Sequence, residues 1–88
     1  MLYERAEHLQ LRKAGEEMLV HDLANEKIHV LNQTAGDLLE HCSRRTPEEL
    51  ASFLRARYEV NGQDIDRDVR EILERFVENG LVNEVPIS

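Results

Sequence analysis

This 88-residue sequence has one cysteine, no tryptophan and no long apolar run, and the lack of cysteines and of apolar runs excludes two classes of protein. The one cysteine cannot form a disulfide within the chain, which excludes a disulfide-stapled scaffold and favours a reducing, cytoplasmic location. No stretch approaches the 18 or so apolar residues of a membrane-spanning helix, and the first eight residues hold no apolar run. We therefore expect neither a membrane span nor a signal peptide.

Basic residues are also few, with 11 Lys and Arg against 18 Asp and Glu and a net charge of −7. Proteins that bind nucleic acid gain much of their affinity by neutralising phosphates, so this chain repels nucleic acid on average. One local basic cluster could hold a few phosphates, although a solvated surface is the simpler interpretation. It consists of Arg44, Arg45, Arg55 and Arg57. We expect no nucleic-acid partner.

Residues that could carry catalysis or bind a metal do not form a known pattern. The soft ligands are four histidines and one cysteine: His8, His21, His29, His41 and Cys42. They show no C-x-x-C or H-x-x-x-H spacing, and adjacent residues on a helix diverge by about 100°, which separates His41 from Cys42. Asp64, Asp66 and Asp68 lack the glycine and the last glutamate of a calcium loop. We expect no catalytic residue, metal or cofactor.

The most informative stretch is residues 27–42, where the apolar period changes from that of a strand to that of a helix. Residues 27–31 alternate in the manner of a β-strand. After Asn32, four apolar residues share one helical face: Ala35, Leu38, Leu39 and Cys42. Thr34, with Asp37 three residues later, predicts the start of this helix, and Asn32 is the alternative cap. This junction fixes how sheet and helices meet.

Two earlier strands are predicted at residues 8–12 and 17–23, joined by a turn at 13–16, after a frayed lead-in at 1–7. Residues 24–26 make a short hairpin connection, with Asn25 expected at positive φ. Three short strands joined by tight turns predict an antiparallel meander.

Two more helices follow the break at residues 43–45. Thr46, Pro47 and Glu49 form a capping-box pattern that starts a helix reaching about residue 58, and residues 60–63 are a predicted loop. The longest helix begins at Asp64 or Asp66 and ends before residues 79–80, an Asn-Gly pair over which residue 81 folds back. Residues 82–85 are expected to complete the packing.

The predicted fold is therefore α+β, a three-stranded antiparallel sheet followed by three helices, with a winged helix-turn-helix outline. Its length predicts one domain over residues 1–88. The sequence leaves open whether the chain is a monomer or a homodimer. A recognition helix that reads DNA needs basic and amide side chains. Residues 64–78 carry three arginines and twice as many acids. This excess of acids argues against DNA binding, and a winged-helix transcriptional regulator is kept only as the alternative to the function described next.

Several short motifs together resemble the coenzyme PQQ synthesis protein D family, in order and over about residues 9–82. They are Val30-Leu-Asn-Gln-Thr-Ala35, Leu38-Leu39, Cys42, Thr46-Pro-Glu-Glu-Leu50, Tyr58, Asp68-Val69, Leu73 and Gly80-Leu-Val82. The family usually has Asp-Gly after the cysteine, where this chain has Ser43-Arg44. That departure leaves open which peptide pathway the chain serves.

The resemblance implies a peptide chaperone without chemistry of its own, also called a RiPP recognition element. Such a protein holds the leader of a ribosomally made precursor peptide and presents it to a modifying enzyme, a radical SAM enzyme in the PQQ case. The leader is expected to add as a strand between the third strand and the third helix. Carried over to this chain, the implied peptide-binding residues are Lys27, Ile28, His29, Val30, Leu31, Arg67, Asp68, Glu71 and Ile72.

These residues also have simpler interpretations. Apolar strand residues such as Ile28 and Val30 are ordinarily core residues, so we assign them a main-chain role in binding. Ile72 is likewise a core candidate. Arg67, Asp68 and Glu71 fit a solvated helix face equally well.

Overall fold

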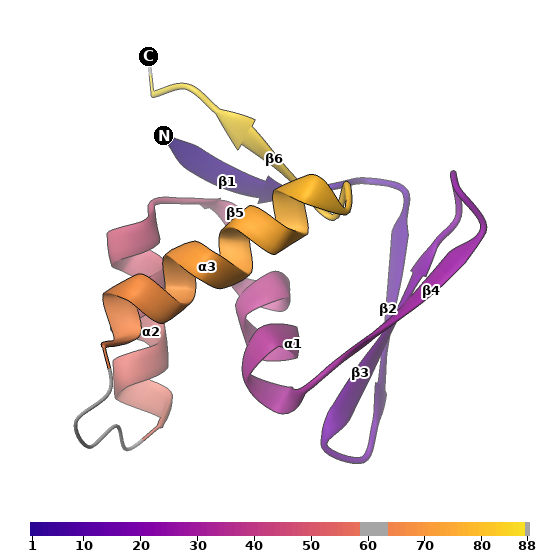
Figure 1. Cartoon of the computed structure of the whole chain (residues 1–88), viewed down its shortest axis with the longest axis horizontal. Helices are drawn as coiled ribbons and strands as arrows, with labels where there is room; N and C mark the ends of the chain where they lie inside the picture. Colours follow the sequence, from indigo (N-terminus) through magenta and orange to yellow (C-terminus); the bar gives the residue numbers. More distant parts are fainter. Residues whose placement is uncertain (59–63, 88) are drawn as a thin grey trace.

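The computed structural model describes residues 1–58 and 64–87 and contains two antiparallel sheets packed on three helices (Figure 1). The first strand, β1 (Leu2–Arg5), lies between β5 (Ser43–Arg45) and β6 (Val82–Val85). The second sheet is the meander of β2 (Leu9–Ala14), β3 (Glu17–Asp22) and β4 (Lys27–Leu31). The helices are α1 (Gln33–His41), α2 (Pro47–Arg57) and α3 (Ile65–Glu78). The predicted α+β class, meander and three helices are confirmed; the predicted loop at 60–63 lies outside the described residues.

The sheet that contains both chain ends was not predicted. The frayed lead-in expected at residues 1–7 is wrong, because Leu2–Arg5 pairs with β6 over its whole length and with β5 on its other side. Ala6 is 4% exposed and donates its N–H to the Leu81 carbonyl at 3.0 Å. A four-residue strand has too short a pattern to stand out from polar neighbours, and its partners lie far along the chain.

The two hairpin turns differ from the prediction in detail. The first turn is Gly15-Glu16, with Gly15 at φ 65. In the second, the Asp22 carboxylate accepts the N–H groups of Ala24 and Asn25 and the Asn25 side-chain amide, the amide at 2.9 Å. Asn25 is therefore held as a donor, and the left-handed residue is Glu26, at φ 54, which corrects the expectation for Asn25.

Helix α1 begins directly after β4, and Asn32 is its cap. The Asn32 side chain accepts the Ala35 N–H at 2.8 Å, so the alternative cap is right and the Thr34–Asp37 cap is wrong. Asp37 is 5% exposed and accepts hydrogen bonds from Arg57 Nε at 2.9 Å and from the Tyr58 hydroxyl instead. Its carboxylate thus ties α1 to the end of α2.

The caps predicted for the other two helices are confirmed. Thr46 and Glu49 exchange hydrogen bonds of 3.1 and 3.0 Å as a capping box. Asp64 accepts the Arg67 N–H at 3.1 Å at the start of α3. Gly80, at φ 73, ends the helix and lets the Leu81 N–H reach the Phe76 carbonyl at 2.8 Å.

The segment between α1 and α2 is a strand, although only a helix break was predicted there. Ser43–Arg45 pairs with β1, and Arg44 adopts φ 57. That left-handed conformation is the one that glycine takes without strain, which explains why a glycine would suit this position.

The core lies between the inner face of the meander and the three helices. Gly36 sets how closely α1 approaches β3, because a Cβ at this position would lie 2.9 Å from the Met18 Cβ. The largest fully buried apolar side chains come from all layers: Val20, Leu38, Leu39, Leu50, Leu54, Val69, Leu73, Leu81 and Val82. None of the described helices has the length and apolar character needed to cross a bilayer.

Candidate functional site: a groove beside a free strand edge

Strand β4 is at the edge of its sheet, since the order is β2-β3-β4. Within residues 1–58 and 64–87, no strand pairs with its outer side. Antiparallel strands alternate between residues that bond to one neighbour and residues that bond to the other. The Leu23 N–H donates to the His8 carbonyl. The backbone N–H and C=O groups of the odd-numbered residues of β3 therefore point to β2, and those of the even-numbered residues point to β4.

This alternation identifies the free backbone groups of β4. The backbone groups of Met18 and Val20 point to β4, where their register partners are Leu31 and His29. The N–H and C=O groups of Leu31 and His29 are therefore hydrogen-bonded within the sheet. Ile28 and Val30 consequently direct their N–H and C=O groups to the open edge. These are the groups that an added strand would pair with.

In β4 the β-branched residues point outward and their neighbours point inward, which is the reverse of what their apolar character predicts. Ile28 is 66% exposed and Val30 58% exposed, whereas His29 and Leu31 are partly buried. The interpretation of Ile28 and Val30 as core residues is therefore wrong. Cross-strand partners share a face, and the buried Met18 and Val20 of β3 select Leu31 and His29 for the inner one.

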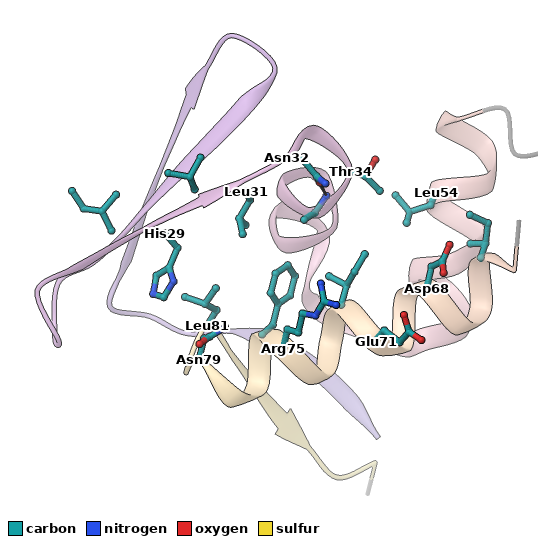
Figure 2. Close-up of a pocket in the computed structure, with 16 residues that line it drawn as sticks. His29, Leu31, Asn32, Thr34, Leu54, Asp68, Glu71, Arg75, Asn79 and Leu81 are labelled. Atoms are coloured by element: carbon teal, nitrogen blue, oxygen red, sulfur yellow. Dashed lines mark hydrogen bonds between the residues drawn. The ribbon is translucent and has the colours of Figure 1, made fainter.

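A groove of about 800 Å³ lies between β4, the start of α1 and one face of α3 (Figure 2). Its floor contains the buried Phe76 and the partly buried Leu31 and Ile72. Polar groups stand along its rim. The lining residues are Ile28, His29, Val30, Leu31, Asn32, Thr34, Ala35, Leu54, Ile65, Asp68, Glu71, Ile72, Arg75, Phe76, Asn79 and Leu81.

The structure brings most of the predicted site residues to this groove. From β4 these are Ile28, His29, Val30 and Leu31, and from α3 they are Asp68, Glu71 and Ile72. Lys27 and Arg67 do not line it. Arg67 is one position before Asp68 and so points about 100° away from it around α3. Lys27 lies at the hairpin end of β4, opposite Asp22 in the strand register. Whether the lining residues bind peptide is a proposal, made below.

Several lining residues were missed. Arg75 and Asn79 continue the stripe that starts at Asp68, and extending the i, i+3, i+4 spacing along α3 would have found them. Leu54 and Ile65 come from α2 and from the first turn of α3, and only their packing together places them here. Asn32 and Thr34 are present because α1 starts at the groove's end.

The rim charges are separated along the groove. Along α3, Asp68 and Glu71 lie toward the Leu54 end of the groove, whereas Arg75 lies between them and Asn79 (Figure 2). In the part of the chain that the structure describes, none of the three charged groups has an ion-pair partner within 4.0 Å. The groove thus combines an apolar floor, the free backbone groups of β4 and a wall formed by α3 that is acidic toward one end and basic toward the other.

The basic cluster considered as a phosphate site is largely engaged within the protein. Arg44 pairs with Glu4 at 3.6 Å, Arg55 with Asp66 at 2.5 Å, and Arg57 with Asp37 at 2.9 Å. Their charges are offset locally, which weakens any attraction for a nucleic-acid backbone.

The residues considered for chemistry are placed as structural groups. Cys42 is 2% exposed, and its burial raises the pKa of the thiol to about 12, so the thiolate nucleophile is nearly absent at neutral pH. His41 stacks on Phe53 with ring centroids 3.8 Å apart, and burial lowers its pKa. Among the described residues, no three His, Cys, Asp or Glu side chains gather as a metal site.

The family comparison decides the classification. The sequence profile described as "Coenzyme PQQ synthesis protein D (PqqD)" matches residues 17–82, which include β3, β4, all three helices and the groove but not β2. The chain belongs to this family. The resemblance found in the sequence is thereby confirmed. No curated protein matches the sequence.

Two solved structures share the PqqD-family fold with this chain. "TbiB1 in Complex with the TbiA(beta) Leader Peptide" superposes with a TM-score of 0.79 at 16% identity, covering 96% of this chain and 99% of that one. "Lasso peptide synthetase B1 complexed with the leader peptide" gives a TM-score of 0.77 at 22% identity, covering 96% and 100%. The two-sheet, three-helix architecture is therefore that of known leader-peptide complexes.

Proposed function

We propose that this PqqD-family chain binds the leader of a ribosomally made precursor peptide as an added strand on β4. The observation that carries the proposal is the open edge of β4 facing the groove. Free N–H and C=O groups supply affinity in strand addition, and pockets for alternate side chains supply selectivity. The two structural neighbours, both described with leader peptides, support it.

The binding residues we propose on β4 are Ile28 and Val30 through their backbone, with His29 and Leu31 through their side chains. On α3 they are Asp68, Glu71 and Ile72, to which we add Arg75 and Phe76 from the lining of the groove. Lys27 and Arg67 keep at most a peripheral role, because neither lines it.

The wider role that we propose is non-catalytic. Residues 1–88 act as one recognition domain that presents the peptide to a modifying enzyme, of the radical SAM type or another tailoring class, in the cytoplasm. Cys42 and His41 were the candidates for a nucleophile and a base. The burial that raises the pKa of the Cys42 thiol and the stacking of His41 on Phe53 support a structural role for both. Monomer and homodimer are both compatible with this role.

The test is the variant Val30→Pro, compared with Val30→Ala. Proline removes the edge N–H and places its ring there, whereas alanine keeps the N–H and removes only an outward side chain. Isothermal titration uses leader segments of short peptides encoded beside this protein's gene. Loss of one hydrogen bond and the steric block weaken binding by about tenfold or more in Val30→Pro.

Amide spectra of isotope-labelled protein check that both variants stay folded and map the shifts. We expect shifts at β4 and along the groove face of α3, and near-normal affinity for Val30→Ala. Equal affinity of a folded Val30→Pro variant would refute strand addition. Saturable, salt-sensitive binding to duplex DNA with no response to any leader would refute the function itself.

A further inference from the structure

The groove has a charge direction that the proposed strand addition does not by itself require. Asp68 and Glu71 stand at the end formed by the start of α1, and Arg75 stands toward the end formed by His29 and Asn79 (Figure 2). At 1.5 Å per residue, Asp68 and Arg75 are about 10 Å apart along α3. An extended peptide of a few residues spans both.

These charges are available to a ligand. The ion pairs that α3 makes with α2 lie outside the groove lining and use Asp66 with Arg55 and Arg70 with Glu48. Within the described residues, Asp68, Glu71 and Arg75 have no such partner. An opposite charge on a bound peptide beside any of the three therefore favours binding, and a like charge disfavours it.

We propose that the groove selects leaders by charge order: a basic side chain beside Asp68 and Glu71, then an apolar one, then an acidic one beside Arg75. This inference rests on the proposed function and deepens it. The apolar position follows from the apolar floor of the groove, where Leu31, Ile72 and Phe76 lie.

The spacing follows from strand geometry. Side chains on one face of a strand recur every second residue, about 6.8 Å apart, so the first, third and fifth residues of the segment face the groove. The first and fifth are about 14 Å apart, and the flexible ends of Lys, Arg or Glu side chains close the remaining few ångströms to Asp68 and Arg75, which are about 10 Å apart along α3. The second and fourth residues lie beside the exposed Ile28 and Val30 and are also expected to be apolar or β-branched.

The chain direction follows from pairing. Strand β4 runs from the His29 end of the groove toward Asn32 and Thr34 at the Asp68 end (Figure 2). An antiparallel partner, which is the more stable arrangement, runs the opposite way. The basic residue therefore precedes the acidic one in the leader.

The experiment screens a display library of short random peptides for binding to the full chain. We expect enrichment of a basic residue, then an apolar one two positions later, then an acidic one two positions further on. The best peptide and its isomer with the two charges exchanged are then compared by titration. Two exposed ion pairs exchanged for two repulsions weaken binding by about tenfold.

A charge-inverted protein completes the test. The triple variant Asp68→Lys, Glu71→Lys, Arg75→Glu is expected to prefer the exchanged peptide, whereas Arg70→Glu, on a side of α3 that does not line the groove, keeps the original preference. Peptides that bind β4 equally well in both charge orders, and lose binding in Val30→Pro, would overturn the charge order and leave the proposed function intact. No peptide binding at β4 at all would overturn both.

Discussion

Replacing Gly36 by alanine tests the junction between β4 and α1 that positions the groove. The added Cβ would lie 2.9 Å from the Met18 Cβ, whereas carbon atoms in contact normally lie 3.5–4.0 Å apart, so α1 and β3 must separate by about 0.6 Å. Overpacking of this kind costs about 1–3 kcal/mol, and the better helix propensity of alanine returns about 1 kcal/mol. We expect a net loss of about 1 kcal/mol, from a total of roughly 4–13 kcal/mol for a chain of this length.

Thermal unfolding followed by circular dichroism measures the effect, which corresponds to a Tm about 4–8 °C lower. The matched control is Ser52→Ala, at an exposed interior position of α2, where alanine adds propensity without a contact and is expected to stabilise by about 0.5 kcal/mol. A Gly36→Ala protein that is stabilised like the Ser52 control would refute the argument that α1 and β3 meet without spare room.

Two further predictions concern titratable groups. Native Cys42 should react with iodoacetamide far more slowly than in denaturant at pH 8, because a pKa of about 12 leaves only about one thiolate in ten thousand; fast labelling of the folded protein would contradict its burial. The Asn25 side-chain amide, with backbone donors and His8, lowers the pKa of Asp22, so this carboxylate stabilises the fold fully above its unfolded pKa near 3.8 and progressively less as the pH falls toward the folded value. Asp22→Asn should therefore reduce the free energy of urea unfolding more at pH 7 than at pH 3, and an equal loss at both would exclude this linkage.

The sequence predicted the elements whose signals are local. The capping box of Thr46 and Glu49, the cap at Asp64 and the glycine stop at Gly80 all form within one helical turn, and all three are confirmed. The alternation at residues 27–31 predicted β4 with its observed bounds. The family resemblance was also readable from short motifs in their order.

Tertiary packing decided the features that depend on distant partners. Leu2–Arg5 is a strand only because Val82–Val85 and Ser43–Arg45 pair with it, and no local pattern announces that. Asp37 left the helix cap for Arg57 and Tyr58, which only the α1–α2 contact brings near.

The same division holds for the candidate site. The sequence identified β4 and the first two turns of the groove face of α3, because a strand and a helix stripe are periodic. Which face of β4 is buried, however, was settled by its neighbour: the buried Met18 and Val20 turn Leu31 and His29 inward and leave Ile28 and Val30 exposed at the free edge. Alternation in a strand fixes that two faces differ, and only the packed sheet decides which of them meets the core.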